Sequence, residues 1–300
     1  MRIFFTFYIF IVSSLFANEV KTIAFAQDNM ANDFRKAQVF EARDEAFKHD
    51  SLHFIYSDAK AKTSLLIYQI DKFIQQKVDV IIVGTNDANA VVPVLNKARA
   101  KGVETIILDR GVNTQEYTTF INSNNIEIGQ IGARYIAQKL NGKGVVLLFE
   151  GLQNADVTHL RSEGFLKEMA KHEEIKVIKR VGNYLRRDAI KEMESVIKEG
   201  VHIDAIFSQS DSMLSGARSA MLRFQIDPSS LITVGCDYTS EAREAIKNGK
   251  QSASILFPLG GVQSIQVAQK ILQGHQVPKH ISIPIKLITK ENVDNSTPIF

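Results

Sequence analysis

Short apolar runs, rich in β-branched residues, alternate with longer amphipathic segments along almost the whole chain. In the longer segments the apolar residues are spaced three and four apart, which is typical of a helix that buries one side. The short runs have the length and composition of buried strands. The predicted strands are Thr22–Ala26, Leu52–Tyr56, Val78–Val83, Thr105–Leu108, Thr118–Ile121, Gly144–Phe149, Ile175–Arg180, Ala205–Phe207, Ile232–Cys236, Ala253–Leu256 and Ile281–Leu287. Predicted helices between them include Phe34–Lys48, Leu65–Gln76, Asn89–Ala100, Ile126–Leu140, Leu160–Lys171, Asp188–Lys198 and Ser212–Arg223.

Strand–helix alternation predicts parallel sheets that are covered by helices on both faces. The units are too many for one small sheet, and a chain of 300 residues also suggests about two domains. One strand–helix series ends near Asp109 and the next begins near Asn124, with no Pro- or Ser-rich linker between them. We therefore predict an α/β protein with two Rossmann-like lobes that are joined by several crossing strands.

The N-terminus has the three-part layout of a secretory signal. The first two residues are a short basic start, residues 3–12 are almost wholly apolar, and a short stretch ending at Ala17 is followed by polar residues. This layout predicts a signal peptide at residues 1–17 and an exported protein. An uncleaved membrane anchor is the alternative. The single cysteine, Cys236, excludes an internal disulfide, so the core must hold the exported chain together.

Composition and motifs argue against several classes of function. The formal net charge is only +3 and no segment is a long run of Lys and Arg, so a nucleic-acid partner is not predicted. Glycine-rich nucleotide fingerprints, a Gly-x-Ser-x-Gly elbow and metal-ligand spacings of the histidines are absent from the sequence. A carboxylate pair for glycoside hydrolysis stays open, although arginines beside the candidate acids oppose an acid role. We predict a binding protein rather than an enzyme, with no cofactor, metal or catalytic residue.

Polar and aromatic residues follow nearly every predicted strand. Ligands of open α/β sheets bind beyond the carboxyl ends of the strands, so these residues form a candidate rim. Carboxylates and amides exchange hydrogen bonds with hydroxyl groups, Arg donates through a planar fork, and aromatic faces pack on the C–H faces of a ring. The mixture predicts a hydroxyl-rich ring as ligand, which means a sugar or a close mimic. The rim comprises Gln27–Arg35, Gly84–Asp87, Asp109, Arg110, Glu150, Gly151, Ser208–Asp211, Asp237, Tyr238, Phe257 and Pro258.

Seven motifs occur together and in order: "IAFAQDNMANDFRKAQ", "VDVIIVGTNDANAVVPVLNKARAKGVETIILDR", "INSNNIEIGQIGARYIAQKL", "LRSEGF", "IFSQSDSMLSGA", "VGCD" and "ASILFPLGG". With them the sequence resembles the ribose-type periplasmic sugar-binding proteins of bacterial ABC importers, from Lys21 to Val293. The resemblance implies the type 1 periplasmic binding protein fold, in which three crossing strands join two lobes that close around a ligand by a hinge. It implies a periplasmic monomer with an N-terminal lobe of residues 18–123 plus 258–284 and a C-terminal lobe of residues 124–257 plus 285–300.

The resemblance also implies ligand contacts from both lobes. Asp109 and Arg110 would hold sugar hydroxyls, Arg161 matches an arginine of the family's binding turn, and Tyr184 matches an aromatic stacking position. The complete set of implied ligand-binding residues is Asp28, Asn32, Phe34, Arg35, Asp109, Arg110, Arg161, Tyr184, Ser210, Asp237 and Phe257.

Several of these positions depart from the ribose pattern. The family often has Ser in place of Asp28, Asn in place of Ser210 and Gln in place of Phe257. The pair Phe34-Arg35 resembles the aromatic–arginine pair of a galactofuranose-type branch. The resemblance therefore implies a sugar site without implying ribose.

Three site residues also have a purely structural interpretation. Phe34 could be a core residue at the start of a helix. Arg35 could pair on the surface with Asp33 or Asp58. Asp237 could cap the helix that begins two residues later.

Two functions share this predicted pocket and differ in the protein partner. The first is transport, in which the protein delivers a monosaccharide or furanose-like molecule to an ABC permease. The second is sensing of a sugar or of autoinducer-2 through a membrane histidine kinase, because "ASILFPLGG" and "IKLITKENVDN" resemble sugar-sensing domains. Repressors of the lac family share the core, but an export signal stands here in place of their helix-turn-helix. The sequence favours transport, with sensing as the alternative.

Overall fold

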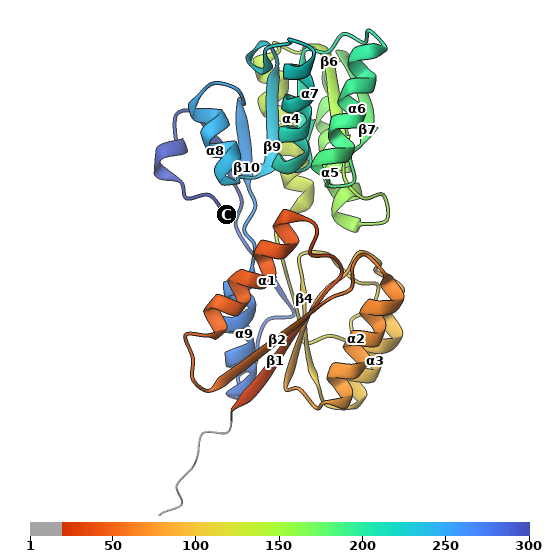
Figure 1. The fold of residues 1–300 in the computed structure, drawn as a ribbon, viewed down its shortest axis with the longest axis vertical. Coiled ribbons are helices and arrows are strands. Elements are labelled where there is room, and N and C mark those ends of the chain that lie inside the picture. The colour runs from red at the N-terminus through yellow and green to blue at the C-terminus, as the bar shows by residue number, and fades with distance from the viewer. Residues whose placement is uncertain (1–19) are drawn as a thin grey trace, which may run out of the picture.

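The computed structural model describes residues 20–300, so the predicted signal peptide at residues 1–17 lies outside the described residues. The described chain forms two six-stranded sheets, each covered by helices on both faces, and the two units stack end to end (Figure 1). The predicted α/β class with two lobes is confirmed. Within residues 20–300, no helix is both long enough and apolar enough to span a bilayer.

The first lobe is built on a sheet with the strand order β11-β5-β4-β3-β1-β2, in which all neighbours are parallel. Helices α1 and α9 cover one face, and α2 and α3 cover the other (Figure 1). The bounds are β1 Lys21–Gln27, α1 Asp33–Ala46, β2 Leu52–Asp58, α2 Thr63–Gln75, β3 Val80–Gly84, α3 Val92–Ala100, β4 Glu104–Leu108, β5 Thr119–Asn122, α9 Gly261–Leu272 and β11 His280–Ser282.

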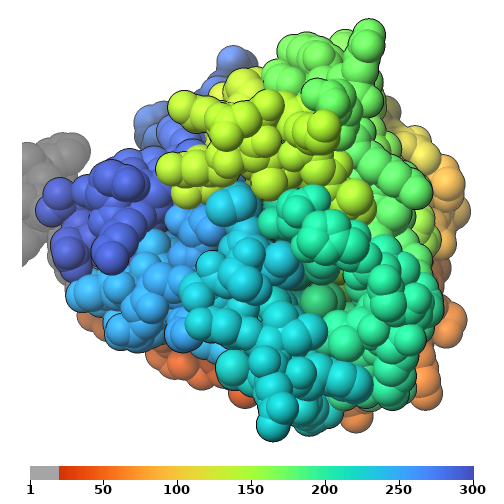
Figure 2. Space-filling view, turned by 90° about the horizontal axis from the view of Figure 1, so that it is seen from above, coloured from red at the N-terminus to blue at the C-terminus, as the bar shows by residue number. Residues whose placement is uncertain are grey.

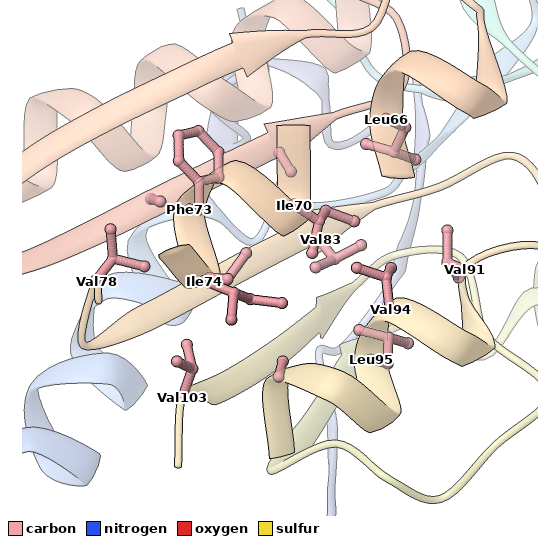
Figure 3. Packing of buried hydrophobic residues seen from close by; sticks show 14 of the residues in the cluster. Leu66, Ile70, Phe73, Ile74, Val78, Val83, Val91, Val94, Leu95 and Val103 are labelled. Carbon is pink, nitrogen blue, oxygen red and sulfur yellow. The ribbon is translucent and has the colours of Figure 1, made fainter. Parts of the chain in front are cut away.

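Periodic apolar residues of α2 bury one side of that helix against the first sheet. Leu66, Ile70 and Phe73 follow one another at intervals of four and three residues, and each is at most 7% exposed. Figure 3 shows them packed beside Val83 of β3 and Leu95 of α3. Burial of such a side chain stabilises a fold by about 1.5–3 kcal/mol, so this layer fixes the sheet that carries the first half of the rim.

The second lobe is built on a sheet with the order β12-β10-β9-β8-β6-β7, in which only β12 is antiparallel to its neighbour. Helices α4 and α5 cover one face, α6 and α7 cover the other, and α8 packs beside α7. The bounds are α4 Asn125–Lys139, β6 Lys143–Glu150, α5 Asp156–Met169, β7 Glu174–Val181, α6 Arg186–Lys198, β8 Ala205–Ser208, α7 Asp211–Arg223, a 3-10 turn Pro228–Ser230, β9 Ile232–Asp237, α8 Ser240–Lys247, β10 Ala253–Leu256, β12 Lys286–Thr289 and a 3-10 turn Val293–Asn295.

The chain passes between the lobes at three places: from β5 to α4, from β10 to α9, and from β11 to β12. The prediction of one strand over Ile281–Leu287 is wrong. β11 pairs with β5 in the first sheet and β12 pairs with β10 in the second, with Pro284 between them. A proline has no N–H to donate to a ladder, which favours a break between strands there. The residue-level lobe boundaries stay a prediction.

The two lobes cover each other along the long axis of the molecule. Viewed from the end that carries the second lobe, the first lobe is visible only at the margins (Figure 2). Residues that follow β4 and β8, and the last residue of β9, line a common cavity at the junction between the lobes.

Candidate ligand-binding site

A cavity lies between the lobes, beyond the carboxyl ends of strands from both sheets, and we call it the inner cavity. Its empty space amounts to about 310 Å³, part of it open to solvent. Every predicted site residue except Asp28 lines it, and one unpredicted residue does so too. The lining residues are Asn32, Phe34, Arg35, Asp109, Arg110, Val157, Arg161, Tyr184, Ser210, Asp237 and Phe257.

A network of ion pairs forms the first-lobe wall of the inner cavity. The guanidinium of Arg35 lies 3.0 Å from Asp109 (Nη2 to Oδ2) and 3.7 Å from Asp28 (Nε to Oδ1). Arg110 Nη1 donates to Asp28 Oδ2 at 3.1 Å. None of these four side chains is more than 8% exposed, so water screens their charges little and each charge is balanced chiefly by its ion-pair partners. Burial, reinforced by the charge of Arg35, lowers the pKa of Arg110.

Local structure brings these groups together from three chain segments. Asp28 follows β1, and Asp109 and Arg110 follow β4. These two strands lie in the same sheet, with only β3 between them. The backbone of Asp109 is left-handed, with φ of 69°, which turns the chain sharply at the strand end. Asn32 caps α1 by accepting from the backbone N–H of Arg35 at 3.0 Å, which holds Arg35 in the first turn.

Arg161 is the cation of the second-lobe wall. Its Nε donates to Asn125 Oδ1 at 2.8 Å, and its Nη1 donates to the backbone carbonyl of Gln209 at 2.7 Å. The guanidinium also lies over the ring of Phe257, 4.7 Å from the centroid. These contacts hold a buried positive charge at the cavity without an ion pair within 4.0 Å to any described residue.

Asp237 is the acid of the second-lobe wall. It ends β9 with a positive φ of 109°, and burial, with the neighbouring charge of Asp211 second, raises its pKa well above the ordinary value. A carboxyl group that holds its proton can both donate to and accept from a hydroxyl group. Asp237 does not cap α8, because Thr239 accepts from the first turn of that helix at 3.1 Å instead. The structural interpretation of Asp237 is therefore wrong.

Aromatic rings complete the inner cavity. Phe34 and Phe257 stack with their centroids 5.2 Å apart and their planes inclined by 26°. Tyr184 lies opposite Arg110, 5.6 Å from ring centroid to guanidinium, and its hydroxyl lies 2.8 Å from Thr158 Oγ1. Phe34 is 8% exposed, so it belongs both to the cavity wall and to the apolar cluster around it.

Replacing Phe34 by leucine should therefore separate these two roles. We expect affinity for the ligand to fall by about 2- to 10-fold, because aromatic contacts contribute about 0.5–1.5 kcal/mol beyond their area. The melting temperature without ligand should change little, because leucine keeps most of the apolar volume. Titration calorimetry and a melting curve check both. Phe54→Leu, a buried position on β2 away from the cavity, is the matched control. A large loss of stability with unchanged affinity would assign Phe34 to the core alone.

Hydrogen bonds across the junction hold the lobes against each other. Asn32 Nδ2 donates to the backbone carbonyl of Tyr184 at 2.9 Å, and the backbone N–H of Gly111 donates to Asp156 Oδ2 at 2.8 Å. Burial raises the pKa of Asp156. Each bond joins a first-lobe residue to a second-lobe residue, so the structure shows the cleft in a closed arrangement.

One alternative interpretation of the first-lobe wall is wrong, and one predicted site residue lies outside the inner cavity. Arg35 is 2% exposed and pairs with Asp28 and Asp109, so the alternative of a surface pair with Asp33 or Asp58 is wrong. Asp28 does not line the inner cavity and reaches it only through its two arginine partners.

Three residues that form or support the second-lobe wall were not among the predicted ligand-binding residues. Val157 lines the cavity from the first turn of α5, and no polar signal marks it. Asn125 and Gln209 position Arg161. Gln209 stands in the predicted rim and could have been proposed from there, whereas Asn125 lies at a crossing with no sequence signal. Within residues 20–300, no group of three or more His, Cys, Asp or Glu is arranged to hold a metal ion.

Comparison with known proteins identifies similar chains of nearly full length. The family model described as periplasmic binding protein domain matches residues 23–276. The ribose import binding protein of Bacillus subtilis is 29% identical over 246 residues, which cover 81% of this chain and 79% of that protein.

Solved structures agree with the fold. An ABC transporter solute-binding protein of Bacillus halodurans with bound myo-inositol is 27% identical, with a TM-score of 0.87 over 93% of this chain and 97% of that chain. The fructose-binding periplasmic domain of a hybrid two-component system is 26% identical, with a TM-score of 0.84 over 91% of each chain.

Proposed function

We infer, from the premise that this chain belongs to the periplasmic binding protein domain family, that it captures a sugar between its lobes and delivers it to an ABC importer. The ligand is a monosaccharide or a sugar-like molecule, enclosed when the hinge closes. The inferred role is binding without chemical conversion. One similar protein is named a ribose import binding protein, and another is an ABC transporter solute-binding protein, which supports the proposal. The mature protein acts in the periplasm as a monomer, exported by residues 1–17.

Buried polar atoms without partners carry this proposal. Asp109 Oδ1 and Arg110 Nε are buried and make no hydrogen bond to any part of the described chain. A buried donor or acceptor without a hydrogen bond destabilises the protein by about 1–3 kcal/mol. A ligand that forms hydrogen bonds to both atoms removes this penalty, which favours its binding. A hydroxyl group donates to a carboxylate and accepts from a guanidinium at the same time. A ring that carries several hydroxyl groups therefore offers partners for both atoms.

The balance of formal charge favours a neutral ligand. Three arginines and three aspartates make up the polar walls and the network directly behind them, so the walls carry at most one excess positive charge when Asp237 holds its proton. The stacked aromatic rings supply the apolar surface on which the C–H face of a sugar ring packs. The groups in this balance are Arg35, Arg110, Arg161, Asp28, Asp109 and Asp237.

Sensing is the second candidate, because one similar structure is the fructose-binding periplasmic domain of a hybrid two-component system. The ligand pocket is the same in both roles, which differ in the membrane protein that recognises the ligand-bound form. Uptake of a labelled sugar by cells lacking this protein distinguishes them. Lost uptake supports transport, whereas normal uptake with lost sugar-dependent gene expression supports a histidine kinase as partner.

A thermal-shift screen of the chain without residues 1–17 tests the proposal directly. The panel comprises pentoses, hexoses, furanose sugars, inositols and autoinducer-2. A ligand at about a thousandfold above its dissociation constant adds about 4 kcal/mol to stability, which should raise the melting temperature by roughly 8 °C or more. A flat response to every compound would contradict sugar binding.

A further inference from the structure

A second cavity adjoins the inner cavity at the mouth of the cleft, and we call it the outer compartment. It encloses about 1230 Å³, part of it open to solvent, against about 310 Å³ for the inner cavity. Both lobes contribute to it. Its lining residues are Asp28, Asn29, Ala31, Asn32, Arg35, Lys60, Ala61, Asn86, Arg110, Leu152, Asn154, Asn183, Tyr184, Leu185 and Arg187.

The two cavities share a common wall. Asn32, Arg35, Arg110 and Tyr184 line both of them. A ligand held in the inner cavity is therefore separated from the outer compartment only by the side chains of these shared residues. A substituent that extends from that ligand toward the outer compartment meets these four residues first.

Two residues that line the outer compartment and not the inner cavity carry a buried acceptor without a hydrogen-bond partner. Asp28 Oδ1 is buried with no hydrogen bond to the described chain, and its one ionic contact, to Arg35 Nε, is long at 3.7 Å. Asn86 Oδ1 is also buried and has no hydrogen-bond partner within residues 20–300. The structure itself thus leaves two oxygen acceptors unused here, and such groups are costly unless a donor meets them.

Neutral amides extend this acceptor pair toward solvent. The side chain of Asn154 makes no hydrogen bond within the described chain, and Asn183 uses only its Nδ2, which donates to Asp188 at 3.0 Å. Amides both donate to and accept from hydroxyl groups. Two cations of the compartment, Lys60 and Arg187, are exposed at its rim, whereas Arg35 and Arg110 are buried in its wall and paired with Asp28. The buried wall therefore offers both acceptors and donors, which matches hydroxyl groups, since a hydroxyl group donates and accepts.

We propose that the outer compartment is a second subsite, which binds a hydroxyl-rich substituent of a ligand whose first ring occupies the inner cavity. The substituent is a second sugar unit or a comparable polyol arm. This inference rests on the proposed sugar-binding function. Under it the protein prefers a disaccharide or glycosylated polyol to the corresponding single ring.

Paired ligands test this preference. We would measure dissociation constants by titration calorimetry for myo-inositol against galactinol, D-galactose against melibiose, and D-fructose against sucrose. In at least one pair the larger ligand should bind about tenfold more tightly, as expected for one or two additional satisfied hydrogen bonds. Asn86→Ala and Asn154→Ala should each reduce the ratio of the two dissociation constants toward one. Asn248→Ala, an exposed position at the end of α8, is the matched control.

The outcomes separate the subsite from the function on which it rests. Single rings that bind while every larger partner binds no better would overturn the subsite and leave sugar binding intact. A preference that persists unchanged in both variants would overturn it too, because the additional contacts would then lie elsewhere. Binding of none of the six compounds, together with a flat thermal-shift screen, would remove the proposed function and the subsite with it.

Discussion

Replacing Arg161 by alanine should raise the dissociation constant for the bound sugar about 30- to 700-fold. The change removes charge-assisted hydrogen bonds in a closed, water-poor cleft, which corresponds to about 2–4 kcal/mol at about 1.4 kcal/mol per tenfold. It also leaves Asn125 Oδ1 and the carbonyl of Gln209 without their donors, and Asp237 without the neighbouring cation. Titration calorimetry with a sugar found in the thermal-shift screen measures the effect.

Two further variants serve as comparisons for Arg161→Ala. Arg161→Lys keeps the charge but loses the planar fork, so an intermediate loss of affinity is expected. Arg134→Ala removes a half-exposed arginine of the same lobe that lies 3.7 Å from Glu168, and it should change affinity less than twofold. Undiminished affinity in a folded Arg161→Ala protein would exclude Arg161 from the binding site.

Replacing Arg35 by alanine should lower the free energy of unfolding by about 3–5 kcal/mol, the usual result of removing one partner from a buried ion pair. Arg35 is the shared cation of Asp28 and Asp109, and it also donates to Gln38 Oε1 at 3.2 Å. Without it, Asp109 has no ion pair within 4.0 Å in the described chain. Urea and thermal denaturation of the ligand-free protein measure the loss.

Arg43→Ala is the matched control for Arg35, because Arg43 lies on the same helix but is one-third exposed and pairs with its neighbour Asp44. Its loss should cost less than about 1 kcal/mol. The double variant Arg35→Met with Asp109→Asn should recover part of the lost stability, because it removes the uncompensated carboxylate as well. Equal effects of Arg35→Ala and Arg43→Ala would contradict the buried network.

Much of the candidate site followed from position along the chain. The carboxyl ends of parallel strands meet at one edge of each sheet, so residues after β1 and β4 of the first sheet, and those at the end of β9 in the second, were expected to belong to a ligand-binding rim. Asp109, Arg110 and Asp237 were found there on that ground. Their role in binding a ligand stays a prediction that the experiments above address.

Other features depended on contacts that strand ends do not report. Asp28 follows β1 as predicted, yet it lines the outer compartment rather than the inner cavity, because its carboxylate is held between two arginines. Asn125 and Gln209 orient Arg161 from a crossing segment and from the end of β8. No local pattern distinguishes a polar side chain that holds another side chain from one that meets a ligand.

The sequence by itself determined the alternation of strands and helices, the division into two α/β lobes and the location of a polar rim. These follow from burial periodicity and chain direction, which are local properties of the backbone. Only the tertiary structure decided that Ile281–Leu287 splits between two sheets, and that Arg110 meets Asp28 from 82 residues away. Such pairings depend on which distant segments pack together, and the free energy of a buried charge is set by those neighbours rather than by its place in the chain.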